Sequence, residues 1–517
     1  MQLKSIGFAL FFAFAGDAQE TSPTTSQTGI ATTATKSSSA SPMKTKSVKI
    51  HGYITALRSP SEFEIDEYRI TKDSAVTLEF ERSEDPQEKA TFNAEEIRVG
   101  TEMEIKGELD EATGQLKART IKINLDEHRR VKRTALMEVA PEIRKAGNAW
   151  EGQLHADGQQ ITINQNTVLT IKPNNSQKKA IKQSAKAAKK QHQIQKSDSD
   201  EEPEEPGVAL SRPDQIPGNT FISYEGVRQK DGTILATKLE FTESELTTAE
   251  VRLWKTLNPK VKMPNLISAR PGDLFIQNVG KFKIVPNAAL QKYLQDLGMS
   301  LIPKSQVILP SGDPRKIPFR FFVVEKKEPN AFALANGTVV VNSGLLAVAE
   351  NEAQVAFVLS HEISHAVEKH TYRQMQYHKK ALLTLRVAGA VAAAKYGKGI
   401  GDLANLTATA IQKGYQRSLE NQSDRVGMEH MMAAGYDPRE APRFWKVMSL
   451  KSGDHRTDFW SDHDNNTTRR SYLISELTNN YASIDFANSR RNSESFTAIV
   501  GTMNAARTPK KAVKVKY

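Results

Sequence analysis

The sequence predicts a multidomain protein in which two small all-β barrels precede a larger α+β domain that is mainly helical with a small sheet. Between residues 47 and 245, short segments alternate apolar and polar side chains and are separated by glycines, which is typical of antiparallel strands and their turns. From about residue 246 onward, apolar side chains recur every three or four residues, as they do on helices. This change of period marks the boundary between the two kinds of domain.

The N-terminus resembles an export signal over residues 1–18. Lys4 supplies the positive charge, residues 6–15 form an apolar run too short to span a bilayer, and residues 13–15 are Ala-Phe-Ala, a suitable cleavage site. An uncleaved N-terminal anchor is the alternative. Residues 19–46 are rich in Ser, Thr and Ala and are expected to be a disordered linker. The sequence therefore predicts an exported protein, periplasmic or envelope-associated in a bacterium.

Two stretches with the period of strands predict two barrels, at residues 47–126 and 127–245. An internal repeat supports two copies, because the glycine-containing segment 107–118 is similar in sequence to segment 226–236. Both copies resemble the small OB-like barrels of bacterial exported proteins, which either bind a partner or shield a neighbouring domain. The second barrel is interrupted at 174–207 by a lysine-rich run followed by an acidic run, which we expect to be disordered.

Composition excludes several classes of function. The 517 residues include no Cys, so the chain has no disulfide framework, no thiolate zinc site and no cysteine nucleophile. The formal net charge of +11 favours peripheral contact with anionic lipid headgroups or cell-wall polymers. Nucleic acid is not expected as a partner, because the acidic run cancels the charge of the lysine run and no aromatic stacking platform lies beside it.

The chemistry is predicted to lie on a helix over residues 351–375, which has no Pro or Gly and carries apolar side chains at helical spacing. On this helix His361 and His365 share one face, so that two imidazoles can bind one metal ion. Glu362 is the next residue after His361 and lies about 100° further around the helix axis. Its carboxylate is therefore placed beside the ion, where a base for a metal-bound water belongs.

A second pair of side chains has the same spacing further along the chain. Glu420 and Asp424 are four residues apart and share one face of a predicted helix. Glu420 is suited to be a third protein ligand that leaves the fourth position open for water. Asp424 is suited to accept the other ring N–H of a ligand histidine and so to fix its tautomer. Taken alone, the pair is equally consistent with a solvated acidic face.

Four segments, at 330–337, 361–370, 415–427 and 434–438, resemble in this order the motifs of the gluzincin metallopeptidases of family M48, whose members include HtpX-like and BepA-like types. The resemblance covers about residues 250–480. It implies a zincin-type metallopeptidase domain over 246–480 and one Zn²⁺ per chain. It also implies that His361, His365 and Glu420 are the metal ligands and that Glu362 and Asp424 are the catalytic residues.

The sequence departs from this family at two places. The family usually has Glu-x-x-Ala before the Asp, and here residues 421–423 are Asn-Gln-Ser. The family often carries Ser-x-His-Pro, and here residues 461–464 lack the Pro, so His463 is interpreted as a surface residue. Tyr415 and His463 are the two candidates for steadying an oxyanion, and the sequence assigns neither.

Other elements follow from local pattern. We expect a helix over 288–300 that Gly298 terminates, a buried strand over 319–324, and an edge strand over 338–342 that lies along the cleft. Residues 381–394 form an Ala-rich segment too short and too charged to span a membrane. Residues 481–517 are expected to be a mobile basic tail.

The function these observations favour is a zinc-dependent endopeptidase that hydrolyses unfolded or misassembled exported proteins in envelope quality control. Two alternatives stay open. One is an exported binding or chaperone-like module whose zinc site is latent or structural. The other is a protein whose barrels carry the main function by binding the envelope, with peptide hydrolysis secondary.

Overall fold

The computed structural model describes residues 45–81, 97–124, 130–172, 208–229, 231–242, 246–377, 414–452 and 466–505. The predicted signal peptide, residues 19–44 of the predicted linker, the charged insertion 174–207, the segment 381–394 and His463 lie outside the described residues. Thr45 and Lys46, predicted to end the linker, are the first residues of a strand.

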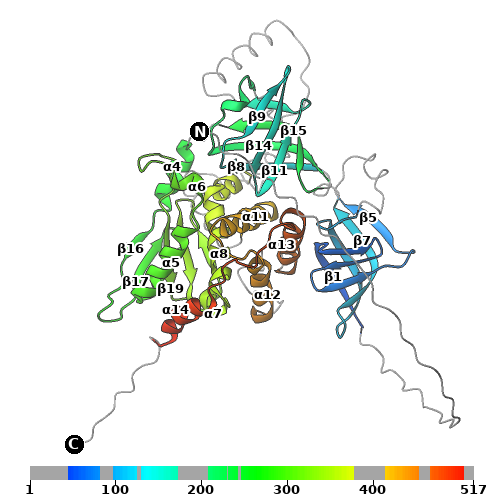
Figure 1. Cartoon of the computed structure of the whole chain (residues 1–517). Coiled ribbons are helices and arrows are strands. Elements are labelled where there is room, and N and C mark those ends of the chain that lie inside the picture. Colours follow the sequence, from blue (N-terminus) through cyan, green and yellow to red (C-terminus); the bar gives the residue numbers. More distant parts are fainter. Residues whose placement is uncertain are drawn as a thin grey trace, which may run out of the picture. The chain divides into compact units, whose positions relative to one another are not determined.

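The first sheet is seven-stranded and mixed (Figure 1). Its strands are β1 (Thr45–Tyr53), β2 (Ala56–Ser59), β3 (Glu62–Ile65), β4 (Tyr68–Thr71), β5 (Thr77–Glu81), β6 (Glu102–Asp110) and β7 (Gln115–Asn124). The order is β1-β6-β7-β4-β3-β2, and both β4 and β5 run parallel to β7. Alternating side chains such as Ile65, Ile105 and Ile121 point into one apolar core, as the period-two pattern requires.

The second sheet is eight-stranded and also mixed. Its strands are β8 (Arg130–Met137), β9 (Glu142–Ala146), β10 (Ala149–Ala156), β11 (Gln159–Ile163), β12 (Val168–Ile171), β13 (Val208–Ala209), β14 (Thr220–Arg228) and β15 (Ile234–Thr242). Strands β11 and β12 run parallel to β15. A register shift at Gly226, between β14 and β15, matches one at Gly107, between β6 and β7. A Cβ at either glycine would lie within 2.6 Å of a carbonyl oxygen of the paired strand, which explains the sequence similarity.

The prediction that each of these regions is a barrel is wrong, because neither sheet closes among the described residues. Both regions are all-β, but in the described part of the chain no strand pairing joins the two ends of either sheet. The pattern of alternating side chains specifies strands and their buried faces. It does not specify which strands pair, and the parallel pairs with β7 and β15 depend on connections that local pattern does not encode.

The third sheet lies in the C-terminal region and has six strands in the order β16-β17-β18-β19-β21-β20 (Figure 1). They are β16 (Lys260–Lys262), β17 (Gly272–Ile276), β18 (Gly280–Ile284), β19 (Arg320–Val324), β20 (Ala331–Ala333) and β21 (Thr338–Asn342). The predicted edge strand 338–342 is therefore wrong: β21 lies between β19 and β20 and is wholly buried. The edge strand on this side of the sheet is β20, whose three residues are too few to give a strand pattern.

Nine of the helices among the described residues belong to the same region, besides the short helical segment 370–377. They are α4 (Thr248–Thr256), α5 (Ala288–Ser300), α6 (Lys304–Val307), α7 (Ser343–Val348), α8 (Glu352–Val367), α11 (Arg417–Ala433), α12 (Glu440–Ser452), α13 (Asn466–Asn480) and α14 (Ser493–Ala505). Helix α5 packs on β19, and α8 packs on β20, β21, α11 and α12. None of the helices among the described residues is both long and apolar enough to span a membrane.

The structure corrects two predictions in this region, the end of the helix at Gly298 and the mobile tail 481–517. Gly298 does not terminate α5, which continues to Ser300. A Cβ at Gly298 would lie 2.5 Å from the ring of Phe321, so this glycine is needed for close packing rather than for stopping the helix. Within the predicted mobile tail 481–517, residues 493–505 form α14, and Phe496 is buried in the main core.

The helix that carries the histidine motif is shorter than predicted. Its N-cap, Asn351, accepts a hydrogen bond from the backbone N–H of Gln354, and α8 then ends at Val367. Lys369 adopts a left-handed backbone with φ +55°, and a new helical segment begins at His370. In one continuous helix His370 would be turned about 140° away from His365. The break brings the two rings together instead.

Candidate metal centre

The three predicted ligands come together between α8 and α11. His361 and His365 project from α8, and Glu420 projects from the first turn of α11. Gly427 allows the close approach of the two helices, since a Cβ there would lie 2.8 Å from the backbone nitrogen of His361. All three side chains are buried, and each offers a ligand atom within 4.8 Å of the others.

The separations fit a tetrahedral metal ion. His361 Nε2 lies 3.0 Å from His365 Nε2 and 3.4 Å from Glu420 Oε2, and His365 Nε2 lies 3.9 Å from Glu420 Oε1. Ligands about 2.0–2.1 Å from a tetrahedral zinc ion are about 3.3 Å apart. Two imidazole nitrogens and a carboxylate are also the donors that zinc prefers, so the residues present fit this metal.

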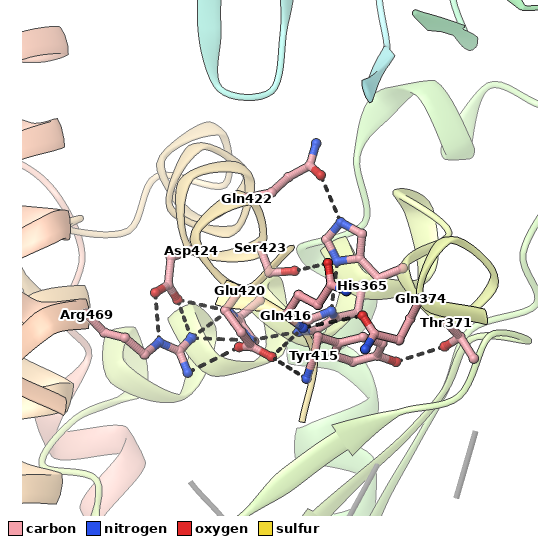
Figure 2. Close-up of polar contacts among 12 residues, drawn as sticks. His365, Thr371, Gln374, Tyr415, Gln416, Glu420, Gln422, Ser423, Asp424 and Arg469 are labelled. Carbon is pink, nitrogen blue, oxygen red and sulfur yellow. Dashed lines mark hydrogen bonds and ion pairs between the residues drawn. The ribbon is translucent and has the colours of Figure 1, made fainter. Parts of the chain in front are cut away.

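Asp424 and Arg469 support the His361 side of the site. Asp424 Oδ1 lies 2.9 Å from His361 Nδ1, within hydrogen-bond distance of the ring nitrogen that faces away from His365 Nε2. Arg469, on α13, makes two hydrogen bonds to Asp424, at 2.6 and 2.9 Å, and its Nη1 lies 3.3 Å from Glu420 Oε2 (Figure 2). The guanidinium also stacks on Trp445, with 3.8 Å from its carbon to the ring centroid. Arg469 was not predicted.

Charge on this side of the site controls the proton of His361. Burial and the nearby Arg469 lower the pKa of His361, but hydrogen bonds to Asp424 and Glu420 outweigh them and raise the pKa to about 9. A bound cation would take the place of that proton, since both are held by the same carboxylates.

The His365 side is supported by neutral groups. His370 Nδ1 lies 2.8 Å from His365 Nδ1, and His370 Nε2 lies 3.0 Å from Gln422 Oε1. Ser423 Oγ, in the position where the family usually has Ala, lies 3.1 Å from His370 Nδ1. Burial and the neighbouring His361 hold the pKa of His365 well below its usual value. The role of His370 was not predicted, although it lies inside the motif segment 361–370.

Glu362 lies beside the ligands, as predicted for a base. It accepts a hydrogen bond from the backbone N–H of Ala333, in the edge strand β20. Its side chain is 4% exposed, and burial raises its pKa to about 7, against the opposing effect of His361. A carboxylate with a pKa near neutrality can both take up and release a proton during a reaction at that pH.

Tyr415 supports the site rather than facing open space. Its ring stacks on that of His365 with 4.2 Å between centroids, and its hydroxyl lies 2.8 Å from Thr371 Oγ1. Its backbone N–H donates to Glu420 Oε1 at 3.2 Å (Figure 2). The Tyr415 hydroxyl is therefore already paired, which does not favour it as the group that steadies an oxyanion. The other candidate, His463, lies outside the described residues.

The fold and the site together define a class. Two histidines one turn apart on a helix, a glutamate on a second helix and a further glutamate beside them are the arrangement of groups typical of zincin-type metallopeptidases.

Comparison with known proteins gives the same class. Residues 288–479 match the sequence profile of peptidase family M48, and residues 51–122 match that of a domain of unknown function, DUF5666. The chain is 30% identical over 181 residues to the beta-barrel assembly-enhancing protease of Escherichia coli strain K12, which is 34% of this chain and 36% of that protein. It is 31% identical over 159 residues to the mitochondrial metalloendopeptidase OMA1 of Arabidopsis thaliana, which is 30% of this chain and 31% of that protein.

Over residues 288–479 the chain is therefore similar to peptidase family M48. The matched region contains every residue of the metal centre described above. The chain spans about a third of the length of the curated relatives it matches.

Proposed function

We propose that this protein is a zinc-dependent endopeptidase in which His361, His365 and Glu420 hold one Zn²⁺ and Glu362 is the general base. The observation that carries the proposal is the buried set of three ligand atoms within 4.8 Å of one another, with Glu362 next to it in sequence and in space. The match of residues 288–479 to peptidase family M48 supports the same activity.

The chemistry follows from the groups around the site. When bound, zinc supplies a Lewis acid that polarises the scissile carbonyl and lowers the pKa of water. Glu362 takes the proton of the attacking water and passes it to the leaving amine. Asp424 holds His361 in one tautomer, and Arg469 holds Asp424 in place.

The edge strand β20 is the proposed position of the substrate main chain. In the antiparallel pair of β20 with β21, Leu334 N–H bonds to Thr338 and Asn342 N–H bonds to Asn330. By this alternation the main-chain groups of Ala331 and Ala333 face away from β21. The Ala333 N–H reaches Glu362, so an extended chain added along this edge would pass beside the base. Main-chain pairing of this kind accepts many sequences and requires an unfolded segment.

We therefore propose unfolded or misassembled exported proteins as substrates, in the periplasm or envelope of a bacterium. The names of the bacterial relatives connect a similar peptidase with the assembly of β-barrel proteins, which supports a role in envelope quality control. The net charge of +11 supports peripheral contact with anionic lipids or cell-wall polymers.

The test is cleavage of an unfolded protein by the purified chain and by Glu362→Gln, with zinc content measured on both. We expect the variant to keep its zinc and to lose about 10²–10⁴-fold in kcat, the usual contribution of a general base. Glu352→Gln is the matched control, because Glu352 is a buried glutamate of the same helix that bonds Tyr436 and Tyr293 away from the ligands. If both wild type and Glu362→Gln bind zinc and neither cleaves, the protein is a binding module and the proposed function is wrong.

A further inference from the structure

His370 is a buried histidine that the proposed mechanism does not use. It follows the interruption of the helix at Lys369 and is fully buried. Its Nδ1 lies 2.8 Å from the Nδ1 of His365. Two imidazole nitrogens at this distance need one proton between them, because two lone pairs would repel. Which ring carries that proton decides which nitrogen of His365 is available to a metal ion.

The side chain amide of Gln422 decides the direction of the hydrogen bonds. Its Oε1 lies 2.7 Å from Nη1 of Arg373, and a guanidinium only donates. Its Nε2 lies 3.2 Å from the backbone carbonyl of Thr134 and 3.3 Å from Glu368 Oε2, and the carbonyl only accepts. Turning the amide over would put donors against donors. The oxygen of Gln422 therefore faces Nε2 of His370 at 3.0 Å, and His370 must donate to it.

The remaining protons then follow one by one. His370 carries its proton on Nε2. It is fully buried, and the polar groups within hydrogen-bond distance of its ring are the amide of Gln422, the imidazole of His365 and the hydroxyl of Ser423, so a second proton has no carboxylate partner there and Nδ1 is an acceptor. His365 must donate from Nδ1 to that acceptor, which leaves the lone pair of His365 on Nε2. That is the nitrogen that lies 3.0 Å from His361 Nε2 and 3.9 Å from Glu420, where the metal ligands meet.

We propose that His370 is a positioning residue that keeps the proton of His365 on Nδ1 and so directs the Nε2 lone pair to the metal ion, with Gln422 fixing the direction of the relay. The inference rests on the proposed zinc site and not on peptide hydrolysis. The carbonyl of Thr134 belongs to β8, so the second N-terminal sheet supplies one end of the relay.

The second sheet thereby acquires a role in the support of the metal centre. Besides Thr134, the backbone N–H of Leu136 donates to Glu368 Oε2 at 3.0 Å, which holds the carboxyl that faces the Gln422 amide. The relay thus runs from a main-chain carbonyl of the second sheet through Gln422 and His370 to a metal ligand. Outer partners of this kind commonly contribute 10–100-fold to metal affinity.

The test compares the zinc dissociation constant and the melting temperature of His370→Phe with those of His430→Phe. Phenylalanine keeps a ring of similar size but neither donates nor accepts a hydrogen bond. His430 is the matched control, because it is a buried histidine of α11 that bonds Glu138 of the N-terminal region at 2.8 Å and does not contact a ligand. We expect both variants to melt earlier, and only His370→Phe to weaken zinc binding, by about 10–100-fold.

A second pair of variants keeps the proposal testable even if His370→Phe does not fold. Gln422→Met removes the acceptor for His370 and should weaken zinc binding at least tenfold. Asn421→Met is its matched control, because Asn421 is a buried amide of the same helix that donates to the Tyr53 hydroxyl at 3.1 Å, and this variant should bind zinc within about threefold of wild type. The proposal is overturned if His370→Phe binds zinc as wild type does, if His430→Phe weakens zinc binding equally, or if Gln422→Met and Asn421→Met do not differ. Zinc binding is measured without substrate, so these outcomes do not depend on whether the protein cleaves peptides.

Discussion

The two histidine ligands lie one turn apart on the same helix and are supported in opposite ways. His361 is held by charged groups: the Asp424 carboxylate on its Nδ1 and the Arg469 guanidinium on that carboxylate. His365 is held by neutral groups, His370 and then Gln422. The first arrangement depends on balanced buried charge and the second on the direction of hydrogen bonds. The same task, leaving a lone pair on Nε2, is thus achieved by two kinds of interaction that should fail differently.

The largest effect is expected from breaking the charged side. Asp424→Asn leaves the Arg469 guanidinium buried without its main carboxylate partner. Removal of one member of a buried ion pair commonly costs about 3–5 kcal/mol of folding free energy. We expect a loss of this size in urea denaturation of the zinc-free protein.

The double variant Asp424→Asn/Arg469→Met sharpens this expectation. If the cost comes from an uncompensated charge, the double variant should be more stable than Asp424→Asn alone, and the two single effects should not add. Additive effects, or a single variant that loses less than about 1 kcal/mol, would contradict the charge-based account of this side.

A smaller effect is expected at the residue next to Asp424. Arg425 points the other way along α11 to Asp157, in the turn between β10 and β11, with Nη2 to Oδ1 at 2.5 Å. Asp157 is fully buried; Arg425 and Arg133 overcome the opposing effect of that burial and lower its pKa from 3.8 to about 2. A lowered pKa stabilises the folded state above the unfolded value of 3.8, and this contribution, about 2 kcal/mol, is lost as the pH falls towards 2.

The measurement is the difference in unfolding free energy between wild type and Asp157→Asn from pH 6 to pH 2. We expect the wild type to be more stable at pH 6 and the difference to shrink by about 2 kcal/mol below pH 4. A difference that stays constant over this range would show that Asp157 keeps an ordinary pKa in the folded protein.

Prediction from the sequence succeeded where one helix alone fixes the geometry. The pairs His361/His365 and Glu420/Asp424 are each four residues apart, and that spacing places both members on one face whatever the tertiary structure. The structure places His361, His365 and Glu420 together and sets Asp424 against His361, as the spacing and the family resemblance implied. Their chemical roles stay proposals until they are measured.

Prediction failed where the geometry depends on distant or irregular backbone. Arg469 lies 45 residues from Asp424 in the sequence. Its neighbours in the sequence do not distinguish it from an exposed arginine. His370 reaches His365 only because Lys369, a residue with no special preference for it, takes a left-handed conformation. The edge strand was misplaced for a similar reason, since the order of β20 and β21 is decided by pairing and not by their own residues.

The smallest effect is expected from Ser423→Ala on the neutral side. The hydroxyl lies 3.1 Å from His370 Nδ1, but His365 already donates to that nitrogen in the proposed relay. Loss of one such hydrogen bond is worth about 0.5 kcal/mol, so the zinc dissociation constant should rise no more than about two- to threefold. A tenfold rise would mean that Ser423, and not His365, is the main donor to His370.

In the proposed function, one buried zinc ion per chain is responsible for peptide hydrolysis. The most direct test removes the metal with a chelator and then follows cleavage of an unfolded protein as zinc is returned. We expect no cleavage without metal and a rise in cleavage that reaches its plateau at one zinc per chain, with no recovery in a His365→Phe variant. Full cleavage by the metal-free protein, or recovery in that variant, would contradict it.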